Sequence, residues 1–149
     1  MIRVLGIASG GGHLHELKRS LKLIREKKNH EIMMISCSNG RSEAELDHGI
    51  YWISDPEQSI VKHVVNTAIA LYYLIKIRPN VIISTGAGVA VPFLVCGKLF
   101  KCTVIFIESG ARISALSKTG RLAYCFVDFF FVQSEQLVLK YPKAKYGLL

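Results

Sequence analysis

Three glycine-containing segments hold the residues of this sequence whose types and spacing could do chemistry. They are Ser9-Gly10-Gly11-Gly12-His13, Thr85-Gly86-Ala87-Gly88 and Glu108-Ser109-Gly110-Ala111-Arg112. Glycine between a strand and a helix lets the backbone approach a ligand closely, and the unpaired N–H groups at the helix start can bind an anion. Together with Arg112, the three loops therefore predict a phosphate or diphosphate site, although each loop alone could be a tight turn without a ligand.

His13 is the histidine that is best placed for catalysis, because it lies where the first loop enters a helix. A neutral imidazole in that position could take the proton of a sugar hydroxyl as a general base. The same side chain could instead cap the helix or bind the anion. The other four histidines are expected on the surface or in packing, and no histidine or cysteine spacing indicates a metal site.

The common nucleotide-binding motifs do not fit. In a dinucleotide-binding fingerprint beginning at Gly10, the last glycine position is occupied by His15. No carboxylate follows the second strand, where a ribose would need one. Gly97-Lys98 lacks the upstream glycine and the following Ser or Thr of a phosphate-binding P-loop. The sequence therefore argues against a dehydrogenase or a P-loop enzyme, and it indicates no cofactor.

The elements that must position these loops alternate between strand and helix. Hydrophobic periodicity predicts strands at residues 4–9, 31–37, 49–54, 81–84, 103–107 and 128–132, and helices at 13–28, 59–77, 89–100, 119–126 and from 134 onward. Strands that are apolar on both faces and alternate with helices indicate a parallel sheet covered on both sides. We therefore expect one doubly wound, mostly parallel, Rossmann-like α/β domain over residues 1–149, with its ligand site at the carboxyl ends of the strands.

The amino-acid composition and the net charge narrow the classes of binding partner that this protein could have. Half of the 149 residues are hydrophobic, and the formal net charge is +8. This surplus suggests an anionic partner, which could be nucleic acid, a phosphorylated small molecule or an anionic membrane. No basic motif that could read a nucleic-acid groove is present, so nucleic acid is not expected. The four cysteines are expected to be reduced thiols, and the chain to be cytosolic without a signal peptide or membrane span.

The chain resembles the membrane-associated subunit of the two-component UDP-sugar transferases. The eukaryotic subunit of this family pairs with a small catalytic partner to add the second GlcNAc of the dolichol-linked oligosaccharide, and bacterial relatives serve capsule and exopolysaccharide synthesis. Beyond the three loops, the resemblance rests on Leu14 and Glu16 after the first loop, on Pro92 after the second, and on residues 116–121, 128–133 and 141–147. The segments cover nearly the whole chain in the order typical of the family, with Ser9 in place of the usual first glycine.

The resemblance implies one half of a split GT-B transferase, equivalent to the N-terminal, acceptor-side half. A separate catalytic subunit, resembling the C-terminal half, would hold most of the UDP-sugar site. The acceptor would be a polyprenyl-diphosphate-linked saccharide. The N-terminal transmembrane helix of many eukaryotic members is not found in this sequence, so attachment is expected to be peripheral, on the cytoplasmic face of the membrane.

The predicted helix at residues 59–77 is the candidate for that attachment. Its apolar face, tyrosines and basic end suit a helix lying in the membrane interface, whereas Lys62 and other polar residues make spanning costly. A helix buried against the sheet or against the partner is the alternative. The residues expected at the membrane are Leu71, Tyr72, Tyr73, Leu74, Ile75 and Lys76.

These inferences combine into one hypothesis for the site, within an acceptor-binding and membrane-docking subunit. His13 is the candidate base, and Glu108 is an orienting or alternative basic group. The acceptor diphosphate is expected to contact Ser9, Gly10, Gly11, Gly12, Thr85, Gly86, Gly88, Ser109, Arg112 and Ser117. Two rivals remain: a non-catalytic scaffold that recruits the partner to the membrane, and a free-standing small α/β enzyme that acts on a phosphorylated metabolite.

Overall fold

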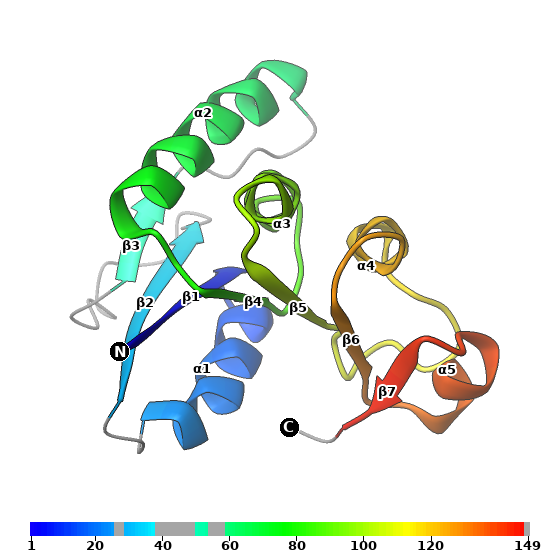
Figure 1. Ribbon diagram of the computed structural model, residues 1–149. Helices are drawn as coiled ribbons and strands as arrows, with labels where there is room; N and C mark the ends of the chain where they lie inside the picture. Colours follow the sequence, from blue (N-terminus) through cyan, green and yellow to red (C-terminus); the bar gives the residue numbers. More distant parts are fainter. Residues whose placement is uncertain (26–28, 38–49, 54–58, 148–149) are drawn as a thin grey trace.

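A computed structural model describes residues 1–25, 29–37, 50–53 and 59–147, and shows a parallel sheet flanked by helices (Figure 1). Within these residues, seven strands lie in the order β3-β2-β1-β4-β5-β6-β7, and every neighbouring pair is parallel. The strands are β1 (Ile2–Ser9), β2 (His30–Cys37), β3 (Ile50–Ile53), β4 (Val81–Ser84), β5 (Thr103–Ile107), β6 (Phe129–Val132) and β7 (Ala144–Tyr146). The helices are α1 (Gly12–Arg25), α2 (Ile60–Ile77), α3 (Ala90–Leu99), α4 (Lys118–Tyr124) and α5 (Glu135–Lys140).

The predicted doubly wound α/β class is confirmed, and the predicted elements are present with small shifts at their ends. Residues 26–28 of the first expected helix and residues 49 and 54 of the third expected strand lie outside the described residues. One strand was missed. The three residues of β7 follow a proline and lack an apolar run, and only their pairing with β6 makes them a strand.

Two apolar cores form because successive side chains of a strand point to opposite faces of the sheet. Leu5 and Ile7 of β1 point to the face covered by α2, α3 and α4, where they join the larger core with Phe93 and Phe106. Val4 and Ala8 point to the other face, against Leu14, Leu17 and Leu21 of α1. Gly6 lets α1 pack closely, since a Cβ there would lie 2.9 Å from the Leu21 side chain.

Local hydrogen bonds and backbone conformation fix the two ends of α2. The Ser59 hydroxyl caps the helix by accepting a hydrogen bond from the Lys62 N–H at 3.4 Å. Arg78 ends the helix in a left-handed conformation with φ 49°, and its N–H donates to the Leu74 carbonyl. Pro79 then cannot continue the helix. Pro92 is accommodated because it lies in the first turn of α3, where no intrahelical N–H bond is lost.

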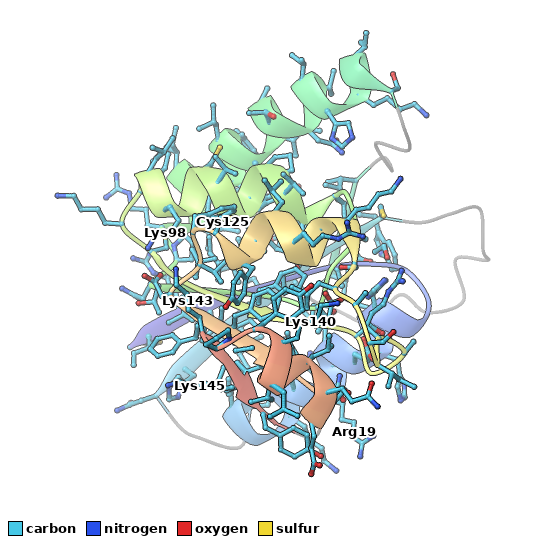
Figure 2. The ribbon with its side chains drawn as sticks, turned by 90° about the vertical axis from the view of Figure 1, so that its right-hand side faces the viewer. Arg19, Lys98, Cys125, Lys140, Lys143 and Lys145 are labelled. Carbon is cyan, nitrogen blue, oxygen red and sulfur yellow. The ribbon has the colours of Figure 1, made fainter. Side chains whose placement is uncertain are left out.

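An ion pair joins α3 to the start of β6 at the amino end of the strands. The ammonium of Lys98, which is labelled in Figure 2, lies 2.6 Å from the Asp128 carboxylate. The second oxygen of that carboxylate accepts a hydrogen bond from the Val104 N–H at 2.8 Å. Burial raises the pKa of Asp128, but the hydrogen bonds from Lys98 and Val104 and the lysine charge lower it by more, leaving it below its ordinary value. This contact lies far from the loops of interest and serves packing.

The cysteines of this chain are reduced and are not joined in disulfide bonds. Cys37, Cys96 and Cys102 are buried, whereas Cys125 is exposed at the C-terminal cap of α4 (Figure 2). Burial raises the pKa of the Cys96 and Cys102 thiols, which keeps them protonated and unreactive near neutral pH.

The strand order places a topological switch point between β1 and β4. From β1 the chain moves outward to β2 and β3, and then returns to β4 on the other side of β1 and continues away from it. The loops that follow β1 and β4 therefore leave the sheet side by side. Ligands of open parallel α/β sheets bind at such a point, beyond the carboxyl ends of the strands.

Candidate functional site

The loops after β1 and β4 are tied to each other at the switch point. The ring Nδ1 of His13 lies 2.8 Å from the carbonyl oxygen of Thr85, and the Thr85 hydroxyl donates to the carbonyl oxygen of His13 at 2.6 Å. These two hydrogen bonds join residues 72 positions apart. The first two predicted loops thus meet at a fixed geometry.

The hydrogen bond to Thr85 determines which ring nitrogen of His13 can accept a proton. A carbonyl oxygen only accepts, so Nδ1 must carry the proton and donate it. In the neutral ring, Nε2 then holds the lone pair. The side chain is 35% exposed, and Nε2 makes no hydrogen bond to any described residue. His13 therefore presents a basic nitrogen at the carboxyl edge of the sheet.

Two glycines shape the space around this ring. Gly86 has φ +118° and lies against the imidazole, since a Cβ at this position would be 3.2 Å from Cε1 of His13. Gly11 has φ +69°, a conformation that residues with a side chain rarely adopt. By contrast, a Cβ on Gly12 would meet no described atom within 4 Å. The backbone at the start of α1 is therefore open to an approaching group, as a phosphate site requires.

The third loop is joined to α1 by Glu16, which was not among the predicted site residues. One carboxylate oxygen of Glu16 accepts from the Ser109 hydroxyl at 3.1 Å and from the Gly110 N–H at 3.0 Å. The other lies 3.9 Å from Nδ1 of His13. The signal available in the sequence was the spacing of three residues from His13, which puts both side chains on one helix face.

Glu108 lies beneath the third loop and is 1% exposed. Its carboxylate accepts from the N–H groups of Ser109 and Ser117 at 3.2 and 2.9 Å and from the Ser117 hydroxyl at 3.1 Å. Gln133, at the end of β6, donates to the Glu108 carbonyl at 3.1 Å. A carboxylate so enclosed cannot reach an acceptor in this structure. Of the two roles considered for Glu108, this geometry favours the orienting one.

Two predicted diphosphate contacts need correction, because their hydroxyl groups are already used. The Thr85 side chain is fully buried, and its hydroxyl donates to His13. The Ser117 hydroxyl donates to Glu108 and accepts from the Gly120 N–H at 2.9 Å, which caps α4. Both side chains build the loops, and pattern alone could not show that they turn inward.

The other predicted contacts stay near the edge, and their role in binding stays a prediction. Gly10 is fixed by a hydrogen bond from its N–H to the Cys37 carbonyl at 3.1 Å. Arg112 is exposed in a turn closed by its N–H and the Ser109 carbonyl at 2.9 Å. Ser9 and Gly88 are partly exposed. Within the described residues, no group of three or more His, Cys, Asp or Glu side chains could hold a metal ion.

Of the residues of α2 that were predicted to face the membrane, some are exposed and others are buried. Tyr72 and Ile75 are 57% and 58% exposed, and Leu71 is 37% exposed. Leu74 is 1% exposed and belongs to the core, so its assignment to the membrane interface is wrong. Tyr73 is partly buried and packs on Tyr51. A helical repeat of 3.6 residues necessarily turns one of four consecutive residues inward.

The outer face of α2 is nonetheless apolar along its length. The exposed residues of the helix include Val61, Val64 and Val65 in addition to Leu71, Tyr72 and Ile75. Lys76 lies over the Tyr72 ring at 5.6 Å, at the basic end of the helix. No helix among the described residues is long and apolar enough to cross a membrane.

Fold and site together define a Rossmann-like α/β domain with a histidine and the N–H groups of a helix start at its switch point. A family model described as "Oligosaccharide biosynthesis protein Alg14 like" matches residues 53–149, and the chain belongs to this family. It is 26% identical to the UDP-N-acetylglucosamine transferase subunit ALG14 of Mus musculus, with 97% of this chain and 81% of the relative covered. The Yarrowia lipolytica subunit is 34% identical over 61% of this chain and 45% of that relative.

Solved structures confirm the fold. Acinetobacter baumannii MurG matches with a TM-score of 0.74 at 15% identity, over 91% of this chain and 43% of that chain. The UDP-bound MnaA of S. aureus matches with a TM-score of 0.77 at 9% identity, over 97% of this chain and 44% of that chain. The chain thus spans less than half the length of either structure.

Proposed function

We propose that this chain is the acceptor-binding and membrane-docking subunit of a two-component bacterial glycosyltransferase. The enzyme transfers a sugar from a UDP-sugar to a polyprenyl-diphosphate-linked saccharide, in capsule or exopolysaccharide biosynthesis. It works on the cytoplasmic face of the cell membrane. The observation that carries the proposal is that the chain belongs to the Alg14-like family and matches a UDP-N-acetylglucosamine transferase subunit over 97% of its length. In this proposal, a separate catalytic subunit supplies the UDP-sugar site.

The chemistry proposed for His13 follows from its fixed tautomer. With Nδ1–H donated to Thr85, Nε2 accepts the proton of the acceptor hydroxyl as that oxygen attacks the anomeric carbon of the donor. The new bond forms between the acceptor oxygen and the anomeric carbon. The bond from that carbon to the UDP oxygen breaks, and UDP leaves with the electron pair. Attack opposite to the leaving group inverts the anomeric centre.

The acceptor diphosphate is proposed to sit at the start of α1. The first N–H groups of this helix have no partner within the helix, and the helix dipole favours negative charge there. Gly12 leaves the approach open, and Arg112 is exposed on the neighbouring loop. The arrangement puts the diphosphate beside His13, so that the carried sugar can reach Nε2.

The partnership is tested by reconstitution. Purified alone, the chain is expected to show no detectable sugar transfer, because the donor half of the cleft is missing. Co-expression with a small UDP-binding half-transferase encoded beside it should give a stable complex that transfers sugar to a polyprenyl-diphosphate acceptor. The measurement is radiolabelled sugar in the lipid fraction. Robust transfer by the isolated chain would refute the split enzyme and favour the free-standing one.

The apolar outer face of α2 is proposed to rest on the membrane. A helix that is apolar on all sides is normally buried, yet this one leaves large side chains exposed along one face. Lys76 and Arg78 at its end can contact anionic headgroups, and Tyr72 suits the headgroup depth. Docking this face would bring the site to its lipid-linked substrate.

Substitutions on the exposed and the buried side of α2 distinguish membrane binding from packing in the core. Leu71→Ser with Ile75→Ser should leave the fold intact and weaken binding to anionic vesicles about tenfold or more, since each buried side chain contributes roughly 1.5–3 kcal/mol. Leu74→Ser should instead destabilise the fold by roughly 2–5 kcal/mol, the usual cost of truncating a buried leucine. Vesicle sedimentation and thermal unfolding measure the two effects.

Leu139→Ser is the matched control, because Leu139 is 86% exposed on α5. The Leu139→Ser variant should change neither vesicle sedimentation nor thermal unfolding. Salt should also weaken vesicle binding by screening the basic residues. If the Leu71 and Ile75 variant sediments like the unchanged chain, the face of α2 does not contact the membrane.

A further inference from the structure

Glu16 uses its two carboxylate oxygens differently. Oε1 accepts two hydrogen bonds, from the Ser109 hydroxyl and the Gly110 N–H, and so joins α1 to the loop after β5. Oε2 is buried and accepts no hydrogen bond from the part of the chain that the structure describes. It lies 3.9 Å from Nδ1 of His13, one helical turn earlier.

The two hydrogen bonds between Glu16 and the third loop do not explain why this side chain carries a negative charge. A glutamine could accept the same two hydrogen bonds with its amide oxygen and would carry no charge. A buried carboxylate oxygen without a donor is costly, so a carboxylate at this position needs a reason outside packing. Among the described residues, the His13 ring is the basic group that lies within 4.0 Å of this oxygen.

We infer that Glu16 is a positioning residue that supports His13 during proton transfer, an inference that rests on the proposed role of His13 as base. The two neighbours of Nδ1 have separate tasks. The Thr85 carbonyl, at 2.8 Å, fixes the tautomer and the ring orientation. The Glu16 carboxylate, at 3.9 Å, is too far for a hydrogen bond and acts through its charge.

The charge matters only when the ring becomes cationic. Before the reaction the imidazole is neutral and gains little from a nearby carboxylate. As Nε2 takes the acceptor proton, the ring becomes an imidazolium, and the negative charge one turn away stabilises it. An interaction that strengthens toward the transition state raises kcat and leaves substrate binding nearly unchanged. The arrangement follows the general pattern of base and orienting carboxylate.

The inference is tested with Glu16→Gln in the reconstituted complex. This variant keeps an oxygen for Ser109 and Gly110 and removes the charge. We expect kcat to fall roughly 10- to 100-fold, KM for the acceptor to stay within about twofold, and the melting temperature to stay unchanged. In the His13→Ala background, Glu16→Gln should cost almost nothing more, because its effect passes through the ring. Glu135→Gln, the same change at an exposed position on α5, is the control and should keep full activity.

The outcomes distinguish this inference from the proposed function. Full kcat for Glu16→Gln beside a large loss for His13→Ala overturns the role of Glu16 and leaves His13 as the base. A loss that is equally large in the His13→Ala background also overturns it, since Glu16 would then act through another group. A lower melting temperature with a raised KM would make Glu16 a structural bridge only. Normal turnover for His13→Ala would show that His13 is not the base. It would then also overturn the inferred role of Glu16, which depends on that base.

Discussion

Replacing His13 with alanine is expected to lower kcat of the reconstituted complex by roughly 100- to 10,000-fold, the usual contribution of a positioned general base. Nε2 is the ring nitrogen left to accept a proton once Nδ1–H is donated to Thr85, so no other atom of the ring can take its place. KM for the acceptor should change little, because the helix N–H groups and Arg112 remain. Steady-state kinetics on the lipid-linked acceptor measure both constants.

The partner should still bind to the His13→Ala protein, since one side chain at the sheet edge is not expected to hold two subunits together. Size-exclusion chromatography of the complex checks this. Gly12→Val gives the opposite pattern: the added side chain meets open space in the fold, and so should mainly raise KM by blocking the diphosphate. Near-normal turnover for His13→Ala would favour the scaffold hypothesis over the catalytic one.

Gly120→Ala is expected to destabilise the fold by roughly 1–3 kcal/mol, the usual cost of overpacking. A Cβ at Gly120 would overlap Oε2 of Glu108 and lie 3.0 Å from the Ser117 hydroxyl oxygen. Glu108 cannot move aside cheaply, because it is buried and accepts three hydrogen bonds. Alanine gains about 1 kcal/mol over glycine in a helix, which is too little to offset the displacement of a buried carboxylate.

Thermal unfolding should show this as a melting temperature lower by several degrees, at about 2–4 °C per kcal/mol for a chain of this size. Turnover should fall as well, because the displaced loop carries the partners of Glu16. Gly147→Ala is the control, since its Cβ would make only an ordinary contact with Phe131 at 3.5 Å. An unchanged melting temperature for Gly120→Ala would mean that Glu108 does not hold the loop.

Local patterns were enough for most of the fold. Apolar runs of strand length alternating with helical spacing such as Leu14, Leu17 and Leu21 predicted the doubly wound class, because burial on both sides of a parallel sheet imposes those patterns. The Ser59 cap and the stop at Arg78-Pro79 were predictable because capping depends on neighbours within one turn. β7 was not, since its three residues become a strand only by pairing with β6.

The sequence by itself determined which loops lie at the carboxyl edge and that His13 stands at a helix start, because parallel strands end at the same edge whatever their order. Only the tertiary structure decided what the side chains there do. It turned Thr85, Glu108 and Ser117 inward to hold the loops. It joined Glu16 to Ser109 across 93 positions of the chain, and it assigned Leu74 to the core. These outcomes depend on hydrogen bonds and packing between residues far apart in the chain, which local spacing does not encode.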